Sequence, residues 1–431
     1  MPTELKRELG LGTATAVVVG EVIAVGIFLT PAQMAKSIGA PLPAFLVWLA
    51  MGTMAVAGAL CYGELASRFP EAGGGYVYLR EAYGPRVAFL YGWKCFLVLD
   101  PGLTAALAVG ISGYVAYMFS VSDWQQKVIA VGTIAAVAAA NVAGLRFGAG
   151  LLRWLTVFKV ALLSVIIVWA FGGKLGDWSN FVPFAMPRSG LPVSAVAGAV
   201  LSGFFSFGGW WDLTKMAGEV RDPSRVLPRA IAYGVCAVTA IYIATSAAFF
   251  YLVPLERVAS GETFAAQAGE ALFGAFGGKA FAAIVVISVL GSLVAIMMAA
   301  PRVYFAMAGD GLFLKSAASV HPRFGTPARA ILLQAALAVL LVVIGTFQQI
   351  VAYFIFITVV FIGLTVASLF VLRRRGASVV FRTPGYPLTP ILFLALVVGL
   401  LALLAFNNPT QALLGAAVVL LGLPAYRLIK C

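Results

Sequence analysis

Long apolar runs recur along the whole chain, and they restrict its possible folds more than any other feature. A helix needs about 20 predominantly apolar residues to cross a bilayer, so we expect about twelve spans. They lie near residues 10–36, 42–67, 86–118, 127–144, 149–172, 191–219, 228–253, 279–307, 328–346, 349–372, 389–406 and 411–428. Membrane β-strands alternate in segments of about ten residues, whereas these runs are continuous. The sequence therefore predicts an all-α polytopic membrane protein with one transmembrane domain over residues 1–431.

The composition excludes the main soluble classes of protein. Hydrophobic residues make up 62% of the chain and charged residues 10%, with a mean hydropathy of +1.01. Soluble domains are about half apolar and about a quarter charged, so an ordinary soluble enzyme, a disordered protein or a nucleic-acid-binding domain does not fit. The 4 cysteines are widely spaced and form no C-x-x-C pair. We therefore expect no disulfide framework, no metal site and no cofactor.

Charge placement predicts the orientation of the spans. The net charge is +13, and most of the 29 lysines and arginines fall in alternate loops. Because cytoplasmic loops collect these residues, the pattern places both termini in the cytoplasm, with Lys215 among the cytoplasmic charges. Lys94 lies early in its span, where its side chain can extend to the inner interface. The short loops favour a multi-pass protein of a bacterial plasma membrane, surrounded by lipid.

Two spans contain glycine clusters at mid-membrane, at residues 20–31 in span 1 and 202–210 in span 6. Glycine lowers helix stability, and paired glycine-interrupted spans in two halves of a chain are the best sequence pointer to a transporter site. Their spacing predicts two five-span repeats, residues 10–172 and 191–373, followed by two extra helices at 389–428. The alternative is that the glycines only permit close helix packing.

An interrupted helix offers backbone groups to a ligand. The N–H groups at a half-helix start attract an anion such as a carboxylate, while freed carbonyl groups accept from an ammonium group. Such groups are tolerated in a membrane only where they are buried in protein or face a water-filled cavity. One site can thus bind both ends of a zwitterion, which points to an α-amino acid as the substrate.

Four groups of motifs follow one another along the chain. They are Val25-Gly26-Ile27-Phe28 with Pro31; Tyr62-Gly63-Glu64-Leu65 with residues 69–85; Phe205 to Trp210 with residues 218–223; and residues 301–304 with 310–313 and 321–327. In this order they resemble the amino acid–polyamine–organocation (APC) transporter superfamily, especially its bacterial permeases and the L-type amino acid transporters. The resemblance implies a LeuT-type fold, with two inverted five-span repeats, spans 1 and 6 broken, and two further C-terminal spans.

The resemblance also implies which residues bind the substrate. They are Val22, Ile23, Ala24, Val25, Gly26, Phe205, Ser206, Phe207, Gly208 and Trp211. The substrate carboxylate would meet the N–H groups of Val25 and Gly26. Its ammonium group would meet the carbonyl groups of Val22, Phe205 and Gly208, and Phe205 would act as an aromatic gate.

The chain departs from the family pattern at three positions. Ala24 and Val25 stand where glycine and then serine or threonine are usual, and Trp211 stands where L-type members have asparagine. These changes narrow the pocket and lower its polarity, so the resemblance is firmer for backbone contacts than for side-chain specificity. Ser206 and Phe207 are expected in the unwound stretch of span 6.

Ionisable residues at membrane depth are functional hypotheses by default. The resemblance implies that Lys159 of span 5 projects toward the break in span 1, into the space that sodium fills in related sodium-coupled transporters. We interpret Lys159 as replacing the coupling cation, and as a candidate proton-coupling group; the alternative is a fixed structural cation. Glu21, just before the break, is the second coupling candidate. It would pair with a cationic substrate, a proton or Lys159, or else serve in helix packing.

Three more acidic residues have two interpretations each. Asp212 either caps the half-helix after the break in span 6 or faces the site. Asp100 lies where a proline predicts a kink, and it either faces the cavity or packs between helices. Glu219, with Arg221, lies at the cytoplasmic end of span 6, where the two would form an inner gate of ion pairs either with Arg68 or with Arg302.

These observations predict a secondary active transporter that moves amino acids by alternating access, without sodium, either coupled to protons or as an exchanger. The alternatives are a polyamine or basic amino-acid carrier, which Glu21 and Asp100 favour, and a non-transporting nutrient receptor on the same fold. An enzyme is not expected, because the sole histidine, His321, lies in a loop with no paired nucleophile or carboxylate at membrane depth. The outer loops are short, so we expect no obligatory glycoprotein partner.

Overall fold

The fold is a helical bundle. The computed structural model describes residues 7–24, 26–185, 191–254, 257, 264–344, 347–376, 379–407 and 409–430. Within these ranges the only β interaction is an isolated parallel bridge between Leu9 and Val220. The predicted all-α class is therefore confirmed for the described part of the chain.

Each predicted span corresponds to one helix or to a pair of helices. The helices are α1 (Leu11–Val22), α2 (Gly26–Ile38), α3 (Pro41–Arg68), α4 (Gly75–Tyr83), α5 (Pro85–Lys94), α6 (Asp100–Phe119), α7 (Asp123–Val142), α8 (Leu145–Gly172), α9 (Val193–Phe207), α10 (Pro223–Leu252), α12 (Phe264–Phe273), α13 (Gly277–Ala299), α14 (Pro301–Gly309), α15 (Ala328–Ile344), α16 (Phe347–Arg374), α17 (Leu388–Asn407) and α18 (Pro409–Lys430). Among the described residues, 9 helical segments are long and apolar enough to cross a membrane. The chain is thus a multi-pass membrane protein.

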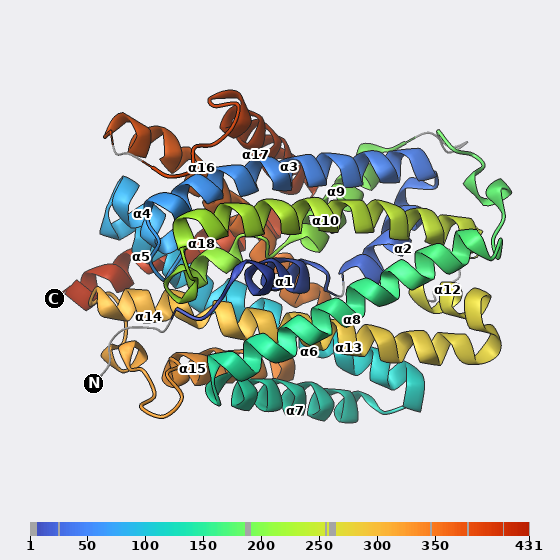
Figure 1. Ribbon diagram of the computed structural model, residues 1–431, viewed down its shortest axis with the longest axis horizontal. Coiled ribbons are helices and arrows are strands. Elements are labelled where there is room, and N and C mark those ends of the chain that lie inside the picture. Colours follow the sequence, from blue (N-terminus) through green and yellow to red (C-terminus); the bar gives the residue numbers. More distant parts are fainter. Residues whose placement is uncertain are drawn as a thin grey trace.

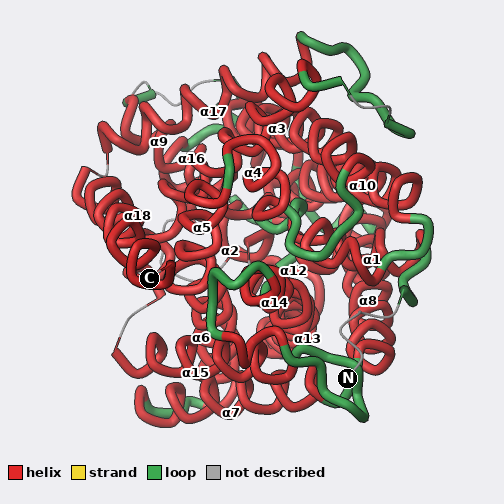
Figure 2. The backbone as a smooth tube through the Cα atoms, turned by 90° about the vertical axis from the view of Figure 1, so that its left-hand side faces the viewer, coloured by secondary structure: helices red, strands yellow, loops and turns green. Residues whose placement is uncertain are grey.

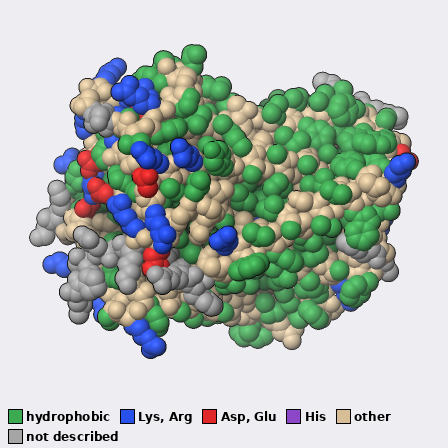
Figure 3. Space-filling view, viewed as in Figure 1, with side chains coloured by type: hydrophobic (Ala, Val, Ile, Leu, Met, Phe, Trp, Pro, Cys, Tyr) green, Lys and Arg blue, Asp and Glu red, His purple; other side chains and the backbone are tan. Residues whose placement is uncertain are grey.

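The helices run mostly along the long axis of the molecule (Figure 1). The first and last described segments reach the same end of the bundle, where α4 and α14 also lie, and Figure 2 views the molecule from this end. Lysine and arginine side chains gather at this end on the face that Figure 3 shows, while the middle of the bundle is apolar. We call the end that holds α4 and α14 the basic end.

The two halves of span 1 lie inside the bundle. Helix α1 packs against α8, α10 and α13, and α2 packs against α9 and α3. Because α9 is the first half of span 6, the two interrupted spans meet directly. This contact brings both interruptions to one place.

Span 3 contains a π-helical turn, Cys95–Leu99, between α5 and α6. Pro101 has no backbone N–H, and in an α-helix its ring would clash with the carbonyl group of Leu97. A widened turn accommodates the proline, so the irregularity predicted here is a π-helical turn. Asp100 begins α6 directly after it and is fully buried.

Candidate functional site

The predicted interruption of span 1 lies between Val22 and Gly26. The amide groups of Ile23 and Ala24 still donate to the carbonyl groups of Val19 and Val22, at 2.9 and 2.8 Å. Helix α2 then begins at Gly26, where a Cβ atom would lie 2.8 Å from the Cα atom of Ser206. Glycine at this position therefore lets α2 approach α9 closely. Val25 lies outside the described residues.

The interruption of span 6 comes after Phe207, where α9 ends. Residues 208–211 form turns, and the 3-10 helix Asp212–Glu219 follows. Gly209 has a φ of +104°, a conformation that only glycine adopts readily. The expectation that Ser206 and Phe207 are unwound is wrong, because the chain leaves the helical conformation only where glycines make this easy.

Side chains of the protein already bond some of the freed backbone groups. The Tyr242 hydroxyl on α10 lies 2.6 Å from the carbonyl oxygen of Val22 and 2.9 Å from that of Ser206. The Thr30 hydroxyl lies 2.6 Å from the Gly26 carbonyl oxygen and 2.6 Å from the Ser206 hydroxyl. These bonds tie spans 1, 6 and 7 together. The Val22 carbonyl oxygen thus accepts from both Ala24 and Tyr242, so a ligand that binds it would replace one of these donors.

Lys159 lies on α8, fully buried, with its ammonium group at the end of α1. It donates to the carbonyl oxygens of Gly20 at 2.9 Å and Ile23 at 2.6 Å, and to the Ser292 hydroxyl at 3.1 Å. An ammonium group has three N–H donors, and all three have acceptors here. A cation at the C-terminal end of a helix also interacts favourably with the helix dipole. The bonds of Lys159 thus fix the backbone of span 1 at its interruption.

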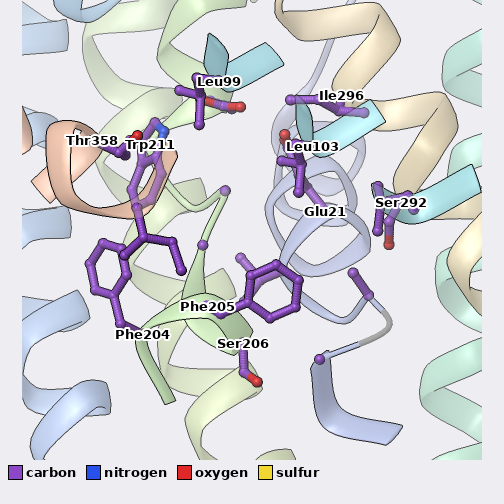
Figure 4. A pocket seen from close by; sticks show the side chains of 18 residues that line it. Glu21, Leu99, Leu103, Phe204, Phe205, Ser206, Trp211, Ser292, Ile296 and Thr358 are labelled. Atoms are coloured by element: carbon purple, nitrogen blue, oxygen red, sulfur yellow. The ribbon is translucent and has the colours of Figure 1, made fainter. Parts of the chain in front are cut away.

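A cavity lies between the two interrupted spans (Figure 4). Of the predicted residues, its lining includes Glu21, Val22, Ala24, Gly26, Phe205, Ser206, Gly208 and Trp211. Its volume is about 40 Å³, against roughly 10–15 Å³ for one water molecule. The cavity is thus small in this conformation, and it would hold an amino acid only if lining side chains such as Phe205 and Trp211 moved.

Three predicted residues do not line this cavity. The Ile23 side chain is fully buried elsewhere, and this residue contributes its carbonyl group to Lys159. The Phe207 ring packs on Trp48 and Tyr242, with ring centroids 6.0 and 5.2 Å apart. Lys159 reaches the backbone of span 1 and not the cavity itself.

Sequence reasoning missed several lining residues. They are Leu99, Leu103, Leu107, Phe204, Gly209, Ser292, Ile296, Ile355 and Thr358, while Asp212, for which a position facing the site was one of two interpretations, also lines the cavity. Figure 4 shows Trp211 and Thr358 on one side of the cavity and Ser292 and Ile296 on the other. The four-residue spacing of Leu99, Leu103 and Leu107 puts them on one helix face, and this spacing was the available signal in span 3.

Two lysines lie deeper than predicted. Lys215, counted as a cytoplasmic charge, is fully buried, with its ammonium nitrogen 3.0 Å from Asp100 Oδ1 and 2.9 Å from Asp212 Oδ1. Lys215 lies on the 3-10 helix after the interruption, and most residues of this helix are buried. Lys94 does not extend to the interface either, because its ammonium group lies over the Tyr91 ring, 4.8 Å from the centroid.

Buried ion pairs lie at the basic end of the bundle. Of the two partners predicted for Glu219, Arg302 is correct, with Nη2 and Oε1 2.8 Å apart and both side chains buried. Arg302 also donates to the Met298 carbonyl group, while Arg68 approaches Glu64 at 3.7 Å.

Backbone bonds join the first described residues to the end of span 6. The N–H group of Leu9 donates to the Glu219 carbonyl group at 2.9 Å, and that of Arg221 donates to the Leu9 carbonyl group at 2.9 Å. The start of span 1 and the end of span 6 are therefore joined at the basic end.

The chain is similar to known transport proteins over nearly its whole length. Residues 9–423 match the amino acid permease family. The chain is 31% identical over 427 residues to the serine/threonine exchanger SteT of Bacillus subtilis (strain 168), which covers 98% of this chain and 96% of that protein. It is 30% identical over 380 residues to the b(0,+)-type amino acid transporter 1 of Homo sapiens, covering 86% and 77%. It is 29% identical over 433 residues to the large neutral amino acids transporter small subunit 2 of Homo sapiens, covering 98% and 80%.

Proposed function

Because the chain belongs to the amino acid permease family, whose members are transporters and not enzymes, we propose that it exchanges amino acids across the plasma membrane. Alternating access would come from movement of the interrupted spans, in a LeuT-type fold with repeats at residues 10–172 and 191–373. The observation that carries the proposal is the cavity between the two interruptions, which both α2 and α9 border.

The substrate would bind at the two interruptions. We place its carboxylate at the N-terminal end of α2, by Val25 and Gly26, because a helix start attracts an anion. The carbonyl groups of Val22, Phe205 and Gly208 would receive its ammonium group. Phe205 lines the cavity, and its ring would close over the bound substrate.

The exchange mode is supported by Lys159. Its ammonium group already uses all three donors on Gly20, Ile23 and Ser292, as a fixed cation would. An ammonium group at this point would take the place of a sodium ion. A relative in the same family is named an exchanger, which supports the same mode. Proton coupling through Lys159 is the competing mode.

The basic end would face the cytoplasm, because cytoplasmic surfaces of membrane proteins collect lysine and arginine. Both chain termini would then be cytoplasmic. In this orientation the buried pair of Glu219 and Arg302 lies between the cavity and the cytoplasm and would act as an inner gate. Cysteine labelling of whole cells at an exposed residue of the basic end tests the orientation.

The test of transport uses the purified chain alone in liposomes, with labelled amino acids outside. We expect uptake only when unlabelled amino acids are preloaded inside, with no effect of sodium. Uptake that needs a pH gradient instead of preloading would mean proton symport. Binding without flux for any solute would mean a receptor. Activity of the lone chain would also show that it needs no glycoprotein partner.

Two matched glycine variants tie this activity to the interruptions. In Gly26→Ala the new Cβ atom would lie 2.7 Å from the Ser206 hydroxyl, whereas in Gly113→Ala nothing lies within 4 Å. We expect the first variant to lose exchange and the second to keep it. Equal exchange in both would contradict a site at the interruption of span 1.

A further inference from the structure

Glu21 is a buried carboxylate that the transport scheme above does not use. It lies on α1, one residue before the helix ends at Val22, with 4% of its surface exposed. It lines the cavity, where Figure 4 shows it well apart from Ser206. Neither of its carboxylate oxygens accepts a hydrogen bond from a donor group within the described part of the chain, and the Asp212 carboxylate lies beside it.

The lysines around the cavity all have other partners. The Lys215 ammonium group is shared by Asp100 and Asp212, at 3.0 and 2.9 Å, and the Tyr304 hydroxyl donates to the other oxygen of Asp100 at 2.7 Å. Lys159 is used by the end of α1. Lys94 lies over aromatic rings. Glu21 is thus without an ion-pair partner among the described residues.

The buried charges around the cavity are not all paired. Glu21, Asp100 and Asp212 bring three carboxylates, and Lys94, Lys159 and Lys215 bring three ammonium groups, but none of these lysines forms an ion pair with Glu21. A buried charge without a partner is strongly unfavourable, so the Glu21 carboxylate must be neutralised. Either a cation of the ligand or a proton does this.

We propose that Glu21 is a subsite for the side-chain cation of a basic amino acid. This inference rests on the proposed function, since the α-carboxylate and α-ammonium groups stay at the two interruptions. Those two groups cancel in charge, so a basic side chain adds one positive charge that can pair with the Glu21 carboxylate. Leu103, Leu107 and Ile296 line the same cavity and suit the aliphatic stem of such a side chain, as long cationic side chains pack their stems on apolar surface.

The test compares arginine with citrulline, which has nearly the same shape but an uncharged end. Each competes against uptake of a labelled amino acid by the purified chain in liposomes. A charge-assisted bond is worth about one to two powers of ten in affinity, so arginine should inhibit at least roughly tenfold more strongly than citrulline. In Glu21→Gln the two inhibition constants should become nearly equal, through weaker inhibition by arginine. Glu71→Gln, whose carboxylate is exposed at 60%, is the matched control and should keep the wild-type ratio.

Three outcomes would overturn the inference. If wild type does not distinguish arginine from citrulline, the carboxylate is neutralised by a proton, and the carrier proposal still stands. If Glu21→Gln keeps the preference for arginine, another group binds the cation. Stronger inhibition by putrescine, which has no carboxylate, would overturn the amino-acid pose. The wild-type comparison needs no variant, so a variant that fails to fold does not remove the test. Absence of transport for every amino acid would instead refute the proposed function.

Discussion

Replacing Lys159 with methionine removes a buried ammonium group and keeps a side chain of similar length. The Ser292 hydroxyl lies 2.6 Å from the Gly20 carbonyl oxygen, so Gly20 keeps a partner. Ile23 loses its bond of 2.6 Å, and an unpaired buried carbonyl group costs about 1–3 kcal/mol. Removing a buried ammonium group relieves a desolvation cost of several kcal/mol. Since the two effects oppose each other, we expect Lys159→Met to fold with a similar unfolding temperature.

Transport should respond much more strongly. A hydrogen bond to a charged group contributes about 1.5–3 kcal/mol, and about 1.4 kcal/mol corresponds to a factor of ten. With the end of α1 no longer held, the initial exchange rate of Lys159→Met should fall roughly tenfold to a hundredfold. The measurement is exchange in liposomes, with thermal unfolding of the same preparation.

The matched control is Lys127→Met. Lys127 is exposed, and its ammonium group donates to the Val343 carbonyl group at 2.8 Å. This bond joins α7 to α15, and neither residue lines the cavity. It should exchange like wild type. A folded Lys159→Met protein that exchanges at the wild-type rate would refute the reasoning. If the methionine variant does not fold, Lys159→Arg, which keeps the charge, is tested in its place.

Three further substitutions test the site and its closure. Ser292→Ala leaves Lys159 with its two carbonyl acceptors, so exchange should fall by only about two- to tenfold; a loss as large as that of Lys159→Met would contradict this ranking. Trp211→Asn removes an indole from the cavity wall, so phenylalanine should gain as an inhibitor relative to alanine in competition assays, and an unchanged ratio would show that the wall does not limit size. Glu219→Gln leaves Arg302 buried without its ion pair and should lower the free energy of unfolding by about 3–5 kcal/mol. Glu71→Gln, in an exposed pair, should lower it by less than about 1 kcal/mol; equal shifts in thermal unfolding would contradict the difference.

The membrane spans could be predicted because their signal is local. A run of apolar residues of sufficient length reads as a helix whatever surrounds it, and the glycine clusters at residues 20–31 and 202–210 marked the two interruptions. The backbone conformation of the glycines then determined the residue at which the helix ends. Ser206 and Phe207 remain helical because the easy exit from the helix is Gly209, with its positive φ, and not the first glycine of the cluster.

The charges inside the bundle could not be predicted in the same way. Lys215 was assigned to the cytoplasm from its position near the end of a span, but its partners, Asp100 and Asp212, include a residue more than a hundred positions away. Such pairs depend on how spans 3 and 6 lie side by side. The wall formed by Leu103 and Thr358 depends on the same packing, so it emerges only from the assembled bundle.

The backbone bonds between Leu9 and the segment 219–221 have a mechanical consequence. They join the start of span 1 to the end of span 6 at the basic end through main-chain atoms, so we expect these two pieces to move together in any rearrangement of that end. Main-chain bonds do not depend on side-chain identity. Substitutions at these positions would therefore keep the start of span 1 joined to the end of span 6, whereas an insertion between Leu9 and α1 would let α1 move independently of span 6.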